Sequence, residues 1–253
     1  MLIRNKDYAP GISRTGTEFE PKRKIGSLEK ITVLKGKVVF DIGCGLGGYS
    51  IASVNSKAKY VAGVDPSIDR LKKAKELVKS YDNIDLINAV AEYLPFKNNT
   101  GDIVLLVETI EHVNSEDECL SEIRRILRLK GTLLITAPNK FYLFETHGMR
   151  ISKTKINSIL GVGIPFLSWV PKKLRKRIEL ARIYSLKDID FLLRKNGYDI
   201  FLTDCMMPSL DSLKASESLK FFIRIVFSRI EKVPFIRNLG SNLITVAKPS
   251  YSK

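Results

Sequence analysis

A glycine-rich turn followed by a distant acid is the part of the sequence whose residue types and spacing can do chemistry. Residues 41–48 read DIGCGLGG, and Gly43, Gly45 and Gly48 match the pattern G-x-G-x-x-G. Such a turn lets the backbone approach a nucleotide ligand at a helix N-terminus. Asp65 lies 22 residues after Gly43, which is typical of an acid that binds ribose hydroxyls. Taken alone, this pattern predicts a nicotinamide dinucleotide site.

Asp41 argues against a dinucleotide. It lies two residues before Gly43, inside a predicted strand, where dinucleotide-binding folds normally place an apolar side chain. A carboxylate at this position suits a ligand with a positive group near the turn. The amino-acid end of S-adenosylmethionine (SAM) is such a group.

The elements that position the turn alternate between short β-branched runs and amphipathic helical runs, which favours a parallel sheet covered on both faces. We predict helices over 66–81 and 185–198. A third helix is predicted to begin at the capping box of Ser115 and to run to about Leu129, and Gly131 ends it. The predicted strands are 38–43, 60–65, 84–90, 102–108, 132–138, 199–205 and 242–249.

Four segments together resemble one family, the class I SAM-dependent methyltransferases. DIGCGLG is similar to the family's first motif, and Asp65 ends the second strand like its ribose-binding acid. AEYLPF (91–96) and EIRRILRLKGTLLITAPN (122–139) resemble two later motifs. The resemblance is strong over 36–140 and covers 185–250 as topology only. It implies a Rossmann-like α/β fold with a seven-stranded, mostly parallel sheet whose last strand is antiparallel, with SAM as cofactor and S-adenosylhomocysteine as product.

Two positions depart from the family pattern. Val90 stands where an acid usually precedes Ala-Glu, so the bond to the adenine amino group comes from Glu92, from backbone, or is absent. Gly101 stands where an aromatic residue often precedes Asp102. We interpret Cys44 as a small filler of the turn rather than a nucleophile. The cofactor-binding residues that the resemblance implies are Asp41, Gly43, Cys44, Gly45, Gly47, Asp65, Pro66, Ser67, Ala91, Glu92 and Glu108.

The segment ETIEHV (108–113) ends the fourth strand at the edge of the sheet where such ligands bind. It resembles methyltransferases of quinone and related small-molecule pathways. An oxygen or carbon acceptor needs a base, and His147 is the first choice. Alternatively, Glu111 and His112 cap the next helix, and His147 is a structural or surface histidine. The candidate catalytic residues are His147, Glu108, Glu111, His112 and Tyr142, and no metal site is expected.

We expect one methyltransferase domain over 1–253 with two insertions. An N-terminal extension or helix occupies 1–35, and the cofactor-binding half occupies 36–140. The regular pattern breaks at 140–184 and 206–240, and these segments are predicted to cap the acceptor site.

Positive charge is concentrated in the second half of the chain. The net charge is +15; residues 1–139 carry 21 Lys/Arg against 18 Asp/Glu, and residues 140–253 carry 21 against 9. Residues 159–177 read ILGVGIPFLSWVPKKLRKR, an apolar run followed by five positive charges. This composition, and the amphipathic pattern of 216–233, is typical of a segment that lies on an anionic membrane. The alternative is that both segments are packed against the sheet.

The expected activity is methyl transfer from SAM to an oxygen or carbon of a hydrophobic small molecule, such as a quinone precursor or a lipid. Soluble metabolites, sugars and RNA remain alternative acceptors, and a protein that binds the cofactor without transferring its methyl group is a non-enzyme alternative. Three widely spaced cysteines and the lack of an apolar run of roughly 20 residues favour a cytoplasmic chain, peripheral on the membrane at most. The oligomeric state stays open.

Overall fold

The computed structural model describes residues 19–142, 181–206 and 238–250, with the short pieces 144–145, 149–151, 154–156 and 164–165 and residue 225. The chain divides into two compact units. The sheet unit comprises 18–137, 187–203 and 244–253, and the second unit comprises 1–17, 138–186 and 204–243. His147, nearly all of 159–177 and nearly all of 216–233 lie outside the described residues.

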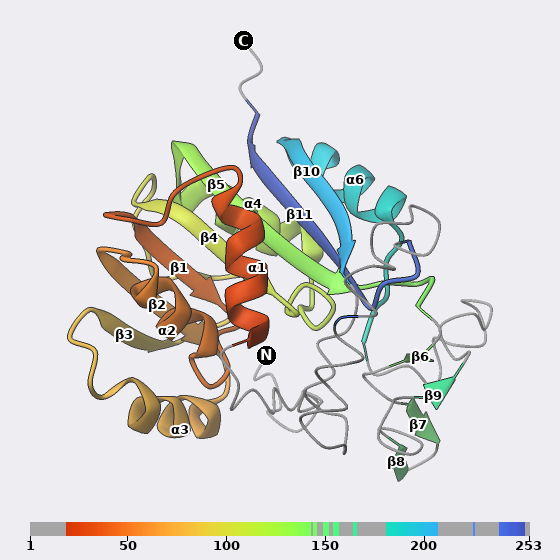
Figure 1. The fold of residues 1–253 in the computed structure, drawn as a ribbon, viewed down its shortest axis with the longest axis horizontal. Coiled ribbons are helices and arrows are strands. Elements are labelled where there is room, and N and C mark those ends of the chain that lie inside the picture. Colours follow the sequence, from red (N-terminus) through yellow and green to blue (C-terminus); the bar gives the residue numbers. More distant parts are fainter. Residues whose placement is uncertain are drawn as a thin grey trace. The chain divides into compact units, whose positions relative to one another are not determined.

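The sheet has the strand order β10-β11-β5-β4-β1-β2-β3. Pairing is parallel for β1 with β2 and β4, for β2 with β3, and for β4 with β5. Figure 1 shows β11 running opposite to its neighbours β5 and β10. The strands are β1 (Val38–Ile42), β2 (Tyr60–Asp65), β3 (Ile84–Asn88), β4 (Gly101–Val107), β5 (Leu127–Pro138), β10 (Tyr198–Met206) and β11 (Asn242–Pro249). The predicted seven-stranded Rossmann-like fold is therefore confirmed.

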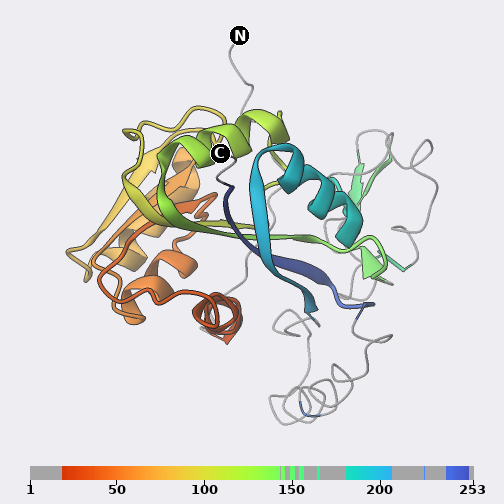
Figure 2. The ribbon, with the colours of Figure 1, turned by 90° about the horizontal axis from the view of Figure 1, so that it is seen from above.

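Helices cover both faces of this sheet. Helices α1 (Phe19–Glu29) and α2 (Gly48–Asn55) lie together on one face, and α4 (Glu116–Ile126) and α6 (Leu186–Lys195) lie on the other (Figure 2). The remaining helix, α3 (Ile68–Val78), packs against β2 and β3. The central strands are buried on both sides because of this double cover; Val104, Leu105 and Leu106 of β4 are fully buried.

The predicted boundary between α4 and β5 is wrong. The helix ends at Ile126, and Leu127 already has extended φ and ψ angles. Leu127 is buried opposite Gly101, whereas the next three residues are exposed, with Leu129 at 68%, so the start of β5 lacks the regular alternation of a half-buried strand. The register shifts between Gly101 and Ile103, and Gly131 lies inside this irregular start of β5 rather than at a helix end.

Within the second unit, two short strand pairs occur, and each is antiparallel. They are β6 (Phe144–Glu145) with β9 (Ile164–Pro165), and β7 (Met149–Ile151) with β8 (Thr154–Ile156). Asn139 joins the end of β5 to the segment before β11, because its side-chain amide donates to the carbonyl oxygens of Asn238 (2.8 Å) and Gly240 (2.7 Å). In the part of the chain that the structure describes, no helix is long and apolar enough to cross a membrane.

Candidate cofactor and active site

The glycine turn joins β1 to α2 and requires glycine at specific positions. Gly43, Gly45 and Gly47 have φ angles of 79°, 54° and 81°, a region that L side chains rarely adopt. The backbone N–H groups of Gly43 and Cys44 donate to Val64 O at 2.7 and 2.9 Å, which fixes the turn against β2. Gly47, rather than Gly48, supplies the left-handed residue that starts α2.

Cys44 fills the tight space beneath the turn. A Cβ on Gly63 would lie 3.0 Å from Cys44 Sγ, so the sulfur packs directly on the backbone of β2. Burial raises the pKa of the Cys44 thiol, which keeps it protonated and a poor nucleophile. These contacts agree with the interpretation of Cys44 as a small filler.

Asp41 is buried in β1, and Ser50 Oγ of α2 donates to its Oδ2 at 2.6 Å. Burial raises the pKa of Asp41 to about 7, although the hydrogen bond from Ser50 acts in the opposite direction. The carboxyl group therefore titrates near neutral pH, and a positive ligand group close to it would favour its charged form.

Asp65 ends β2, and its two oxygens are oriented by backbone. Gly45 N–H donates to Oδ2 at 3.0 Å and Ser67 N–H donates to Oδ1 at 2.8 Å. Arg70 Nη1 lies 3.7 Å from Oδ2. Ser67 follows half-buried Pro66 and caps α3 by accepting from Arg70 N–H. A carboxylate offers about four acceptor positions, so Asp65 retains capacity for hydroxyl groups.

Ala91 and Glu92 follow β3 and are both buried. Glu92 Oε1 accepts hydrogen bonds from the backbone N–H groups of Asn114 (2.6 Å) and Ser115 (3.4 Å). Glu92 thereby fixes the end of the loop that carries residues 108–113.

Glu108 begins this loop with a left-handed backbone (φ 48°), which is uncommon for a residue with a side chain. Its Oε1 accepts from Thr136 Oγ1 of β5 at 2.6 Å and from Lys24 Nζ of α1 at 3.1 Å. Lys24 and Thr136 therefore hold the carboxylate of Glu108 at the carboxyl end of β4. The hydroxyl of the next residue, Thr109, is within hydrogen-bond distance of two carbonyl oxygens, Val107 O at 2.9 Å and Ile42 O at 3.2 Å, and the second contact connects this loop to β1.

The other predicted catalytic residues are distributed between the two units. Glu111 is fully buried in the loop after β4, and its Oε1 lies 3.9 Å from Nε2 of half-buried His112. Ser115 caps α4 by accepting from Glu118 N–H, as the capping box predicted, whereas Glu111 and His112 precede this cap. Tyr142 belongs to the second unit, where burial raises its pKa.

Lys24 is the functional candidate that the sequence interpretation missed. A lysine in a sequence is normally expected to be exposed to solvent, yet the Lys24 side chain is only 2% exposed. The available signal was its position on the helix, because Pro21, Lys24, Ile25 and Leu28 share one stripe at helical spacing and all four are buried.

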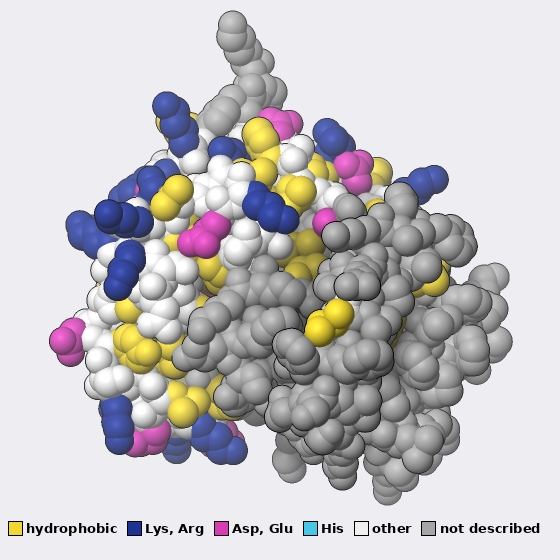
Figure 3. All heavy atoms as spheres, in the orientation of Figure 1, with side chains coloured by type: hydrophobic (Ala, Val, Ile, Leu, Met, Phe, Trp, Pro, Cys, Tyr) yellow, Lys and Arg dark blue, Asp and Glu magenta, His cyan; other side chains and the backbone are white. Residues whose placement is uncertain are grey.

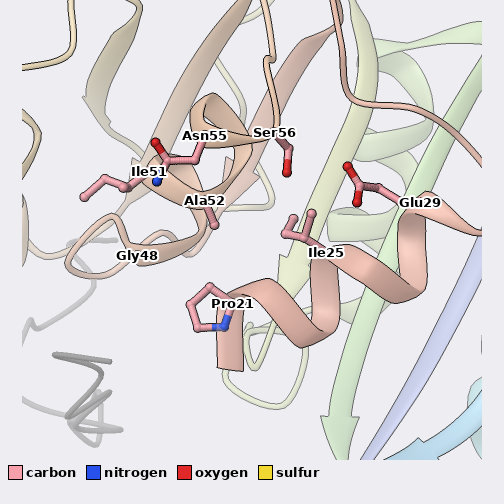
Figure 4. A pocket seen from close by; sticks show the side chains of 8 residues that line it. All are labelled: Pro21, Ile25, Glu29, Gly48, Ile51, Ala52, Asn55 and Ser56. Atoms are coloured by element: carbon pink, nitrogen blue, oxygen red, sulfur yellow. The ribbon is translucent and has the colours of Figure 1, made fainter. Parts of the chain in front are cut away.

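A hollow lies between α1 and α2 (Figure 4). Its volume is about 260 Å³. Pro21, Ile25 and Ala52 are among its apolar lining residues, and Glu29, Asn55 and Ser56 are the polar ones. Among the described residues, no group of three or more His, Cys, Asp or Glu side chains is arranged to hold a metal ion.

Comparison with known proteins relates the fold and the glycine turn to methyltransferases. Residues 40–135 match the methyltransferase domain family. A SAM-dependent methyltransferase from Mesorhizobium loti has the same fold, with a TM-score of 0.60 and 16% identity over 92% of this chain and 98% of that one. Residues 40–135 therefore carry a methyltransferase domain, for which SAM is the methyl donor, and the sheet has the fold of a SAM-dependent methyltransferase, which confirms the resemblance.

The relatives found by sequence are named for different methyl or carboxymethyl transfer reactions, or are uncharacterized. An uncharacterized protein of Methanocaldococcus jannaschii is 37% identical over 118 residues, which cover 47% of this chain and 48% of that protein. A tRNA U34 carboxymethyltransferase of Desulfotalea psychrophila is 32% identical over 47% of this chain and 38% of its own length. A demethylmenaquinone methyltransferase of Bacillus licheniformis is 29% identical over 43% and 47%. The chain thus spans about half or less of these relatives.

The residues present fit the nucleoside cofactor that the domain implies. A Cβ on Gly45 would meet no atom within 4 Å. The turn therefore has open space on the side where its backbone is expected to contact the cofactor. Asp65, with its oxygens aligned by Gly45 and Ser67, lies at the adjacent strand end, where it would hold the ribose.

Proposed function

We propose that the chain transfers the methyl group of SAM to an oxygen or carbon atom of a hydrophobic small molecule, such as a quinone precursor or a lipid, at a membrane surface. The observation that carries the proposal is the gathering of three features at the carboxyl edge of one sheet. These are the glycine turn after β1, Asp65 at the end of β2 and the loop that begins with Glu108 after β4. Bound SAM supplies an electrophilic methyl group on a sulfonium.

The residues of the chain contribute mainly by positioning. The turn and Asp65 fix one reactant, and the loop 108–113 borders the other side of the same edge. The contact of the Thr109 hydroxyl with Ile42 O connects the loop to the end of β1, where the turn begins. Holding two reactants in attack geometry accounts for much of the rate enhancement of such a displacement.

Among the described residues, His112 is the best candidate for the base that an oxygen or carbon acceptor needs. Glu108 is a weaker base because its carboxylate already accepts from an ammonium and a hydroxyl group, which stabilise its charged form. His112 lies in the same loop beside buried Glu111, and a nearby carboxylate favours the imidazolium that forms when His112 takes a proton.

A hydrophobic acceptor is supported by the similarity to a demethylmenaquinone methyltransferase and by the composition of 159–177. RNA is the second candidate acceptor, favoured by the net charge of +15 and by the similarity to a tRNA U34 carboxymethyltransferase. Lys and Arg side chains also spread over the described surface of the sheet unit (Figure 3).

Label transfer from methyl-labelled SAM into native-cell lipids, total RNA and small soluble metabolites tests the acceptor. We expect label in the lipid fraction and its loss in His112→Gln. Label in RNA or soluble metabolites alone would contradict the proposal. If no fraction is labelled although the chain binds SAM, the chain is a cofactor-binding protein without transferase activity.

Sedimentation with anionic liposomes tests the membrane contact. We expect binding to be lost when five basic residues become Ser: Lys172, Lys173, Arg175, Lys176 and Arg177. The matched control replaces five exposed lysines of the sheet unit, Lys30, Lys35, Lys57, Lys59 and Lys72, and should still sediment. Equal behaviour of the two variants would contradict a specific role for 172–177.

A further inference from the structure

An ion pair with one deeply buried partner lies at the end of β4. Lys24 Nζ is 3.1 Å from Glu108 Oε1, and the two side chains are 2% and 29% exposed. Nζ also lies 5.8 Å from the centroid of the Tyr49 ring, which presents a weakly negative face to the ammonium. An ammonium removed from water in this way is strongly unfavourable unless negative groups compensate for it.

The conformation of Glu108 is also unfavourable by itself. Its φ angle of 48° is held by two contacts with Thr136, one to the Glu108 backbone N–H (3.1 Å) and one to the carboxylate (2.6 Å). Backbone strain of this kind is concentrated at ligand sites, where it presets a side chain for its partner.

The pair borders the glycine turn. Tyr49 belongs to the first turn of α2, directly after Gly48, and Thr109 contacts the end of β1 through Ile42 O. One positive and one negative group therefore stand together at the edge where the domain places SAM, whose amino-acid end carries an ammonium and a carboxylate on the same carbon.

We propose that Lys24 and Glu108 together recognise this zwitterion, Lys24 through the carboxylate and Glu108 through the ammonium. The proposal rests on the proposed function and deepens it, because it assigns the amino-acid end of the cofactor to two named side chains. Glu108 is the more accessible acid for the ammonium, since its side chain is 29% exposed whereas Asp41 is 1% exposed. Helix α1, which carries Lys24, thereby becomes part of the cofactor site.

Calorimetric titration with two nucleosides tests the assignment. S-adenosylhomocysteine carries the amino-acid end, and 5′-methylthioadenosine lacks it. We expect Lys24→Met to lower the affinity for S-adenosylhomocysteine by about ten- to a hundredfold, which is the effect of losing one hydrogen bond between charged groups. The affinity for 5′-methylthioadenosine should change by less than about twofold. Lys195→Met is the matched control, because Lys195 pairs with Asp117 at 2.6 Å on the surface of the same unit.

The double variant Lys24→Met with Glu108→Gln guards against misfolding, since it removes both charges together. It should keep a folded chain and bind the two nucleosides with nearly equal affinity. Equal weakening of both nucleosides in Lys24→Met, or no weakening of either, would overturn the assignment while leaving SAM binding intact. A wild-type chain that binds neither nucleoside would instead overturn the proposed function itself.

Discussion

Replacing Gly43 by Ala should destabilise the chain more than a left-handed backbone alone explains. A Cβ at this position would overlap Thr109 Oγ1 and lie 2.6 Å from its Cγ2 and 2.9 Å from its Cβ. The φ angle of 79° costs an alanine about 1–2 kcal/mol. Overpacking against Thr109 adds about 1–3 kcal/mol. We therefore expect Gly43→Ala to lower the free energy of unfolding by about 2–5 kcal/mol.

Two other glycines separate these contributions. Gly36 has a φ angle of 75° and open space around a Cβ, so Gly36→Ala should show the backbone cost alone, about 1–2 kcal/mol. Gly45 has a φ angle of 54° and open space as well. Its alanine variant should lose a similar amount of stability and, in addition, affinity for S-adenosylhomocysteine, because the new methyl group points into the cofactor space.

Urea unfolding of the single variants and of Gly43→Ala with Thr109→Ala measures the contact directly. Thr109→Ala removes two of the three atoms that the new Cβ would meet, so the double variant should be more stable than the sum of the single effects by about 1–2 kcal/mol. If Gly43→Ala costs no more than Gly36→Ala, or if the cycle is additive, the reasoning from this contact is wrong.

Two carboxyl groups give further predictions. Burial raises the pKa of Asp41 from the usual 3.8 to about 7, so the folded chain binds this proton more tightly and loses stability as the pH rises from 4 through 7. Between pH 5 and pH 8, Asp41→Asn should gain stability relative to the wild type by about 3 kcal/mol at most, measured by urea unfolding at both pH values; parallel pH profiles would contradict this. Glu92→Gln weakens the bonds to the N–H groups of Asn114 and Ser115, and should lower the free energy of unfolding by about 1–2 kcal/mol. Hydrogen exchange should then accelerate at Asn114, and unchanged protection there would exclude the proposed anchoring role.

The sheet could be predicted because its strands are signalled locally. Buried parallel strands need continuous β-branched runs, and 60–65 and 242–249 have the boundaries that these runs predict. The start of β5 could not, since Leu127 becomes a strand residue only by pairing with Gly101, 26 residues earlier. A helical pattern and an irregular strand start look alike when the partner strand is unknown.

The candidate site divides in the same way. The positions of Gly43, Asp65 and Glu108 at strand ends follow from motif spacing, and the structure brings all three to one edge. The partners of Glu108 do not follow from spacing, because Lys24 is 84 residues away and Thr136 is 28 residues away. Both contacts depend on the strand order and on which face α1 covers, and these are properties of the folded chain.

These long-range contacts connect the loop after β4 to three other elements. Thr109 joins the loop to β1, Thr136 joins it to β5, and Lys24 joins it to α1. A loop constrained by three elements tolerates little change, whereas the segments beyond it are free to vary with the acceptor. The family match covers 40–135, and relatives named for tRNA and for demethylmenaquinone align over 47% and 43% of this chain. We infer that the specificity for the acceptor resides outside 40–135, so exchange of 140–184 with the corresponding part of a relative should change the acceptor while preserving SAM binding.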